Sequence, residues 1–177
     1  MPRPSSRELV LDAYEEQLRA AGPAAVTLEA VARQAGVSKG GLLYHFPSKD
    51  ALRDALLDRL EERNEHDIRQ ARASENDVVG YYLRTSFTDV TEEGPPHRTL
   101  MAVIQLAVHE PSARATLART TQAWRTLLAE ETGDEPTARL LTVLGDGLYL
   151  HAVLDVDESP LLGALPELLN RLRPPAG

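Results

Sequence analysis

The stretch that decides the fold is Thr27 to Lys49, TLEAVARQAGVSKGGLLYHFPSK. Thr27 suits the first position of a short helix, because its hydroxyl can accept hydrogen bonds from backbone N–H groups in the first turn. Gly36 is suited to end this helix, and Ser38 can begin the next one after a turn of a few residues. The apolar residues between recur at helical spacing and predict one buried face: Leu28, Val31, Ala32 and Ala35. The pattern predicts a helix-turn-helix unit.

The helix that follows Ser38 has two glycines, Gly40 and Gly41, in its first turn. Each costs about 1 kcal/mol relative to Ala in a helix. Glycine allows a backbone to approach another surface closely, and helix N-termini attract phosphates. If Val37, Leu42 and Phe46 pack inward, four residues are left to project outward: Lys39, Leu43, Tyr44 and His45. The pattern favours a surface that approaches a nucleic acid, with a poorly formed turn on a small three-helix core as the alternative.

The composition is typical of a soluble globular protein. Hydrophobic residues make up 42% and charged residues 26% of the 177 positions. No apolar run approaches the roughly 20 residues of a membrane span, and the first residues contain no apolar signal segment. The chain has no cysteine, which excludes disulfides, zinc–thiolate sites and thiol catalysis. We therefore expect a cytoplasmic protein with no membrane partner.

The charge is unevenly distributed along the chain. The net charge is −8, yet residues 1–50 contain six basic and six acidic residues and are neutral. The only two lysines, Lys39 and Lys49, both lie in the opening stretch. A neutral head with focused cations can bind DNA while an acidic body is repelled. The alternative is that arginine replaces lysine elsewhere through genomic base composition and that the position of the two lysines is chance.

Helices are expected on both sides of this stretch. Ser5 with Glu8 predicts a capping box at the start of a first helix, which Gly22 should end. A further helix should begin near Ser48 and run into the polar segment 61–77. We predict a DNA-binding domain at 1–50, a linking helix at 51–76 and a larger helical domain at 77–177.

The remainder of the chain shows helical apolar stripes and no alternating run, so the predicted fold class is all-α. Residues 137–156 are apolar on nearly all sides, and residues 160–172 are rich in leucine. A helix that is apolar all round needs burial on all sides. Gly145 and Gly147 would allow close helix contact. We predict a homodimer through about 137–172, because two-fold dimers are the commonest oligomers.

The run TLEAVARQAGVSKGGLLYHFPSKDALRDAL resembles the DNA-binding domain of the tetracycline-repressor (TetR) family. The resemblance implies a recognition helix in the major groove of double-stranded DNA. It implies phosphate contacts by Thr27, Ser38 and Lys49, and base contacts by Lys39 and Gly41. Many members have Tyr where this chain has Leu43, which could instead touch a thymine methyl group. The predicted DNA-binding set is Thr27, Ser38, Lys39, Gly40, Gly41, Leu43, Tyr44, His45 and Lys49.

The same resemblance implies that the second domain contains an inducer pocket and the dimer interface. The expected function is a dimeric repressor that a small apolar ligand releases from a palindromic operator. Met101, Gln105 and His109 share one stripe at four-residue spacing. The candidate ligand-binding residues are Tyr82, Met101, Gln105, His109, Trp124, Tyr149 and His151. For each of them, a place in the core or in the dimer interface is the alternative.

An enzyme is not expected, since the chain contains no GxGxxG, Walker, HExxH or GxSxG motif. Its five histidines show no pair at i, i+4 on a shared helix, so neither a metal nor a cofactor is expected. The alternative function is a DNA-bound regulator or architectural protein that a protein partner controls, with no small-molecule inducer.

Overall fold

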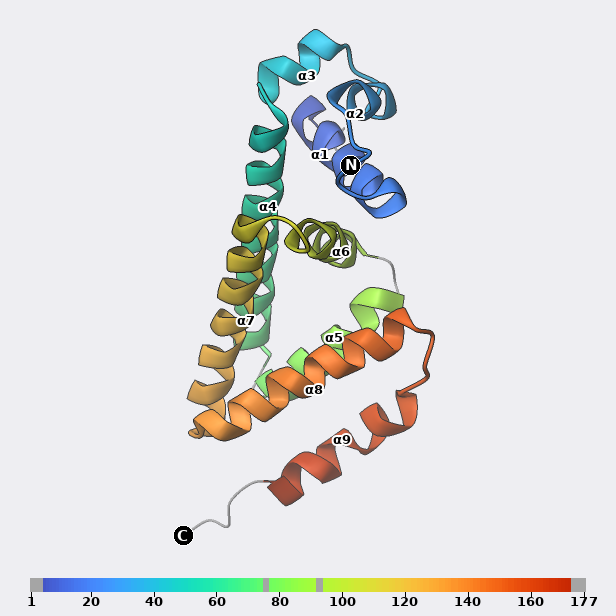
Figure 1. Ribbon diagram of the computed structural model, residues 1–177. Coiled ribbons are helices and arrows are strands. Elements are labelled where there is room, and N and C mark those ends of the chain that lie inside the picture. The colour runs from blue at the N-terminus through green and yellow to red at the C-terminus, as the bar shows by residue number, and fades with distance from the viewer. Residues whose placement is uncertain (1–4, 75–76, 92–93, 173–177) are drawn as a thin grey trace. The chain divides into compact units, whose positions relative to one another are not determined.

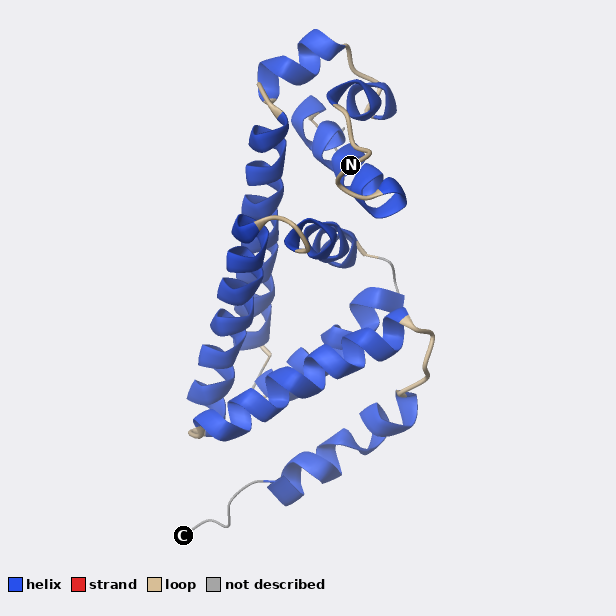
Figure 2. Ribbon diagram, viewed as in Figure 1, coloured by secondary structure: helices blue, strands red, loops and turns tan. Residues whose placement is uncertain are grey.

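A computed structural model describes residues 5–74, 77–91 and 94–172 (Figure 1). Within these ranges the chain is helical and has no strand, which confirms the all-α prediction (Figure 2). The helices are α1 (Ser6–Ala21), α2 (Leu28–Gln34), α3 (Lys39–His45), α4 (Lys49–Arg72), α5 (Val78–Thr91), α6 (Pro95–Ala107), α7 (Pro111–Thr132), α8 (Glu135–Val153) and α9 (Ser159–Leu172).

Side-chain caps fix the starts of the first three helices. The hydroxyl oxygens of Ser5, Thr27 and Ser38 each accept a hydrogen bond from the backbone N–H three residues on, at 3.3, 3.2 and 3.0 Å. Gly36 adopts a φ of +68°, which favours glycine and ends α2. The predicted boundaries of the helix-turn-helix unit are confirmed.

The chain divides into two compact units. The first comprises Met1–Glu65 and Pro95–Thr120, and the second comprises His66–Gly94 and Thr121–Gly177. Helices α4 and α7 therefore each contribute residues to both units. This grouping by contacts differs from the predicted division of the sequence at residues 50 and 76, which stays a prediction.

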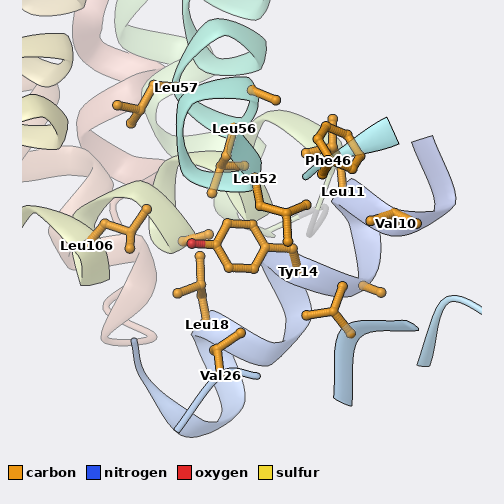
Figure 3. Packing of buried hydrophobic residues seen from close by; sticks show 14 of the residues in the cluster. Val10, Leu11, Tyr14, Leu18, Val26, Phe46, Leu52, Leu56, Leu57 and Leu106 are labelled. Atoms are coloured by element: carbon orange, nitrogen blue, oxygen red, sulfur yellow. The ribbon is translucent and has the colours of Figure 1, made fainter. Parts of the chain in front are cut away.

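The core of the first unit joins α1, α2, α3, α4 and α6. Tyr14 of α1 is fully buried among leucines of its own helix and of α4 (Figure 3). Leu42 and Phe46 pack into the same core, as predicted, and Leu106 brings in α6. Burying one leucine side chain contributes roughly 1.5–3 kcal/mol. Helix α3 thus rests on a core that also includes α6.

A buried arginine of α4 connects this core to α1. The Arg59 guanidinium, only 6% exposed, donates to carboxylates of three α1 residues: Glu8 at 2.5 Å, Asp12 at 2.7 Å and Glu15 at 2.9 Å. Burial acts to lower the pKa of Arg59, but the hydrogen bond with Glu15 and the neighbouring carboxylates outweigh it and raise that pKa. A buried charge of this kind needs all its partners.

Glu15 is also the point where α6 joins this network. Its side chain is 3% exposed and accepts from the Thr99 hydroxyl at 2.5 Å. Arg63 of α4 donates to Glu15 at 3.4 Å, to the Thr99 hydroxyl, and to the Pro95 carbonyl at 2.6 Å. One carboxylate on α1 therefore binds side chains of both α4 and α6.

In the second unit, α5 packs along α8 and also contacts α9. A Cβ on Gly145 would lie 2.6 Å from the ring of Tyr82, so this contact requires glycine. Gly145 therefore allows close packing of α8 on α5 within one chain. A Cβ on Gly147 would have no described neighbour within 4 Å.

Two boundaries differ from the sequence prediction. Helix α6 ends at Ala107, and His109 is exposed beyond it, so the expectation that His109 shares a helical stripe with Met101 and Gln105 is wrong. Helix α8 spans 135–153 in place of 137–156. Its first turn accepts Pro136, because an N–H there has no helical partner to lose. Its last turn is followed by Asp155 with a φ of +56°.

Candidate nucleic-acid interface

Helix α3 has one buried side and one exposed side. Leu42 is fully buried and Phe46 nearly so, which anchors the helix on the core of the first unit. On the other side Tyr44 is 85% exposed, and Leu43 and His45 are also exposed. The side chains of Lys39, Leu43, Tyr44 and His45 project outward, as the sequence predicted.

The two glycines of α3 have ordinary helical backbone conformations, and each meets different surroundings. A Cβ on Gly40 would meet nothing closer than the Ser38 hydroxyl at 4.0 Å. A Cβ on Gly41 would lie 3.3 Å from that hydroxyl, which caps the helix. Packing within the chain thus gives a reason for Gly41, whereas Gly40 faces open space.

The aromatic residues at the end of α3 form a small cluster. The rings of Tyr44 and His45 meet edge to face, with centroids 5.1 Å apart. The guanidinium of Arg7 lies 5.5 Å from the centroid of the Phe46 ring, a cation–π contact. Arg7, which also pairs with the Glu8 carboxylate at 3.1 Å, places a guanidinium beside α3 that the sequence analysis missed. No local pattern indicates it, since the contact joins α1 to the end of α3.

Both lysines of the chain lie in this region, and both have partners. The Lys39 ammonium is 2.5 Å from a carboxylate oxygen of Glu29 on α2. That ammonium, through its hydrogen bond, holds the pKa of Glu29 below its ordinary value. The Lys49 ammonium donates to the carbonyls of Pro23 and Val26 at 2.7 and 3.0 Å. Lys49 therefore braces the segment that leads into Thr27.

The candidate ligand residues fall into both compact units. Met101, Gln105 and His109 belong to the first, and Tyr82, Trp124, Tyr149 and His151 to the second. Of the second group, the structure brings Tyr82 and Trp124 together, with ring centroids 4.8 Å apart.

Tyr82 has the surroundings of a core residue. It is buried, donates to the Thr142 carbonyl at 3.4 Å, and has a pKa raised by burial. His151, on α8, is exposed, and its Nδ1 lies 2.6 Å from the Glu158 carboxylate. The ligand-binding role of all these residues stays a prediction.

The described residues also bear on metal sites and membrane spans. In the ranges given above, no three His, Cys, Asp or Glu side chains gather where they could hold a metal ion. The same ranges contain no helix both long and apolar enough to cross a membrane.

Known proteins resemble this chain over most of its length. The HTH-type transcriptional regulator BetI of Burkholderia thailandensis is 28% identical over 169 residues, which cover 87% of each protein. The structure of the multidrug binding protein EbrR complexed with malachite green has a TM-score of 0.72 and 26% identity, and covers 97% of this chain and 99% of its own. The TetR-family member SCO1917 of Streptomyces coelicolor A3 has a TM-score of 0.69 and 27% identity, with coverages of 97% and 99%.

Two family descriptions match the chain itself. Residues 10–56 match the bacterial regulatory proteins of the tetR family, and residues 76–173 match the tetracyclin repressor-like C-terminal domain. The relatives are transcriptional regulators and not enzymes. With its helix-turn-helix unit and its helical second part, this chain belongs to the TetR family of transcriptional regulators.

Proposed function

We propose that this protein is a cytoplasmic repressor that binds a palindromic DNA operator as a homodimer, with α3 in the major groove, and that a small apolar ligand releases it. The observation that carries the DNA-binding role is the two-sided environment of α3. Leu42 anchors it, while Tyr44 and its exposed neighbours face away from the core. The family match at residues 10–56 supports the same role.

The caps and Lys49 are proposed to bind phosphates. The Ser38 and Thr27 hydroxyls accept from the backbone, which leaves each O–H proton available to donate to a phosphate oxygen. The Lys49 ammonium has three N–H donors and uses two of them on carbonyls. Its third donor, directed at a phosphate, would fix the position of the protein on DNA without reading sequence.

The start and outer face of α3 are proposed to read the bases. Gly40 faces open space, so a groove could approach its backbone closely. Lys39 and Gly41 are assigned to base edges, and Leu43 to a thymine methyl group. Tyr44 and His45, which contact each other, are assigned to the sugar–phosphate rim.

The dimer is proposed to form through α8 and α9. Three apolar residues of α8 and the residue that caps its C-terminal end are 55–65% exposed: Leu140, Val143, Leu150 and Leu154. With Gly147 between them they follow the alternating three- and four-residue spacing of a helix–helix seam. The open space at Gly147 would admit a second helix closely. An exposed apolar stripe of this length, on a helix that packs on α5 through its other residues, is typical of a protein–protein interface.

Control by a small molecule is proposed from the relatives and from the buried network. EbrR is described as a multidrug binding protein and was solved with malachite green. In this chain Glu15 ties α6 to α1 through Thr99, so a ligand that displaces α6 would strain the unit that carries α3. Such a ligand must bind the displaced state more tightly than the DNA-bound state.

Selection of duplexes from a random DNA pool with the purified protein tests the proposal. We expect an inverted repeat whose half-sites lie about 34–36 Å apart, one helical turn, matching a two-fold dimer. Sedimentation of the complex should give two chains per duplex. Failure to enrich any sequence would contradict the proposal. A protein that binds this duplex but is not stabilised by any apolar compound in a thermal-shift screen would instead favour control by a protein partner.

A further inference from the structure

The Glu29–Lys39 ion pair connects α2 and α3, the two helices of the helix-turn-helix unit. Glu29 lies in the first turn of α2 and Lys39 at the first position of α3, ten residues later. Their charged groups are 2.5 Å apart, and both side chains are exposed. The pair therefore lies where α3 would meet DNA, and it is not buried in the core.

The carboxylate is well suited to retain this partner. An acidic residue in the first turn of a helix is stabilised by the N-terminal end of the helix dipole. The hydrogen bond from the Lys39 ammonium lowers the pKa of Glu29, which means that the ammonium stabilises the carboxylate form. While the pair is intact, the Lys39 ammonium has a negative group beside it, and its attraction for a phosphate is reduced.

Lys49, the other lysine of the chain, also has partners, but they are uncharged. The Lys49 ammonium donates two hydrogen bonds to carbonyls, so in the free protein both Lys39 and Lys49 have partners that DNA must share or replace. The partners differ, because carbonyls leave the charge of Lys49 in place, whereas the Glu29 carboxylate neutralises that of Lys39. Only Lys39 is therefore expected to change its net attraction for DNA when its partner is lost.

We propose that Glu29 is a specificity-determining residue, because its carboxylate competes with DNA phosphates for the Lys39 ammonium. At the specific DNA site, acceptor atoms of a base replace the carboxylate as the partner of Lys39. This rests on the proposed DNA-binding role of α3. The matching partner is guanine, whose O6 and N7 face the major groove and accept from lysine. On unrelated DNA the pair stays closed, and Lys39 contributes little to phosphate binding.

The inference predicts how Glu29→Gln changes binding. Exposed ion pairs contribute up to about 1 kcal/mol, so affinity for unrelated DNA should rise about two- to fivefold. The freed lysine displaces one more counterion per subunit, so the slope of log K against log salt should steepen by about 0.9 per subunit. Affinity for the selected duplex should change less. The specificity ratio, which is the affinity for the selected duplex divided by the affinity for unrelated DNA, should therefore fall.

Four proteins separate this role from a general charge effect: wild type, Glu29→Gln, Lys39→Met, and the double variant. The probes are the duplex selected from a random pool and one of equal length, about 30 base pairs, that lacks its repeat. If Glu29 acts through Lys39, Glu29→Gln has no effect in the Lys39→Met background. An equal effect in both backgrounds would overturn the inference. Glu16→Gln, which removes an exposed acid paired with Arg19, is the matched control and should leave the ratio unchanged.

A measurement without DNA tests the pair itself. Titration of the Glu29 carboxyl by NMR should give a lower pKa in the wild type than in Lys39→Met. Equal pKa values would overturn the inference whatever the DNA result. If the wild type enriches no sequence, the proposed function fails. If it enriches a repeat and Glu29→Gln leaves the specificity ratio intact, only this inference fails.

Discussion

Replacement of Glu15 by glutamine tests whether the buried network holds α1, α4 and α6 together. Glutamine keeps the shape of the side chain but removes the charge that accepts from Arg59, Arg63 and Thr99. Removing one partner of a buried ion pair costs about 3–5 kcal/mol. Arg59 keeps Glu8 and Asp12, so the lower end, about 3 kcal/mol, applies.

Thermal unfolding measures this loss. For a chain of this size, 1 kcal/mol shifts the Tm by about 2–4 °C, so Glu15→Gln should lower it by about 6–12 °C. The neighbouring Glu16 is exposed and pairs only with Arg19 among the contacts described for it. Glu16→Gln should therefore stay within about 0.5 kcal/mol of the wild type.

A double-mutant cycle identifies the mechanism. With Arg59→Met as the second change, the double variant should be more stable than the sum of the single losses by about 1–3 kcal/mol, since no buried charge is left without its partner. A Tm for Glu15→Gln equal to that of Glu16→Gln, or strict additivity in the cycle, would refute the account of this network.

Substitutions of single side chains give three further predictions. Lys49→Ala should weaken binding to all duplexes alike, and it should lower thermal stability because Lys49 also donates to the Pro23 and Val26 carbonyls. Lys39→Ala should instead relax the base preference at one position. Binding isotherms on point-variant duplexes measure both effects, and equal sequence dependence in the two variants would contradict this prediction. Tyr14→Phe should raise the free energy of urea unfolding by about 1 kcal/mol, since the buried Tyr14 hydroxyl has no hydrogen-bond partner among the described residues, and a loss of similar size would contradict it. Val143→Glu should convert the proposed dimer to a monomer in sedimentation at micromolar concentration, and an unchanged mass would place the interface elsewhere.

The sequence predicts what depends on local chemistry. Ser5, Thr27 and Ser38 act as caps because the groups they satisfy lie three residues away. Gly36 ends α2 because few other residues adopt its φ. The exposed side of α3 follows from the spacing of Leu42 and Phe46.

Contacts between distant segments could not be predicted in this way. Arg59 and Glu15 are 44 positions apart, and Glu15 and Thr99 are 84 positions apart. Nothing near either residue indicates its partner. The partners of Lys39 and Lys49 depend equally on where folding brings Glu29 and the segment 23–26. The helical stripe assigned to His109 failed because a periodic pattern does not mark where α6 ends.

Methylation interference on the selected duplex tests the central claim, that α3 reads DNA through the major groove. Methyl groups on guanine N7 lie in the major groove, and those on adenine N3 lie in the minor groove. The account predicts interference at guanine N7 in two clusters about one helical turn apart, with the signal at one guanine of each cluster lost in Lys39→Ala. Interference confined to adenine N3, or a guanine pattern that Lys39→Ala leaves unchanged, would contradict it.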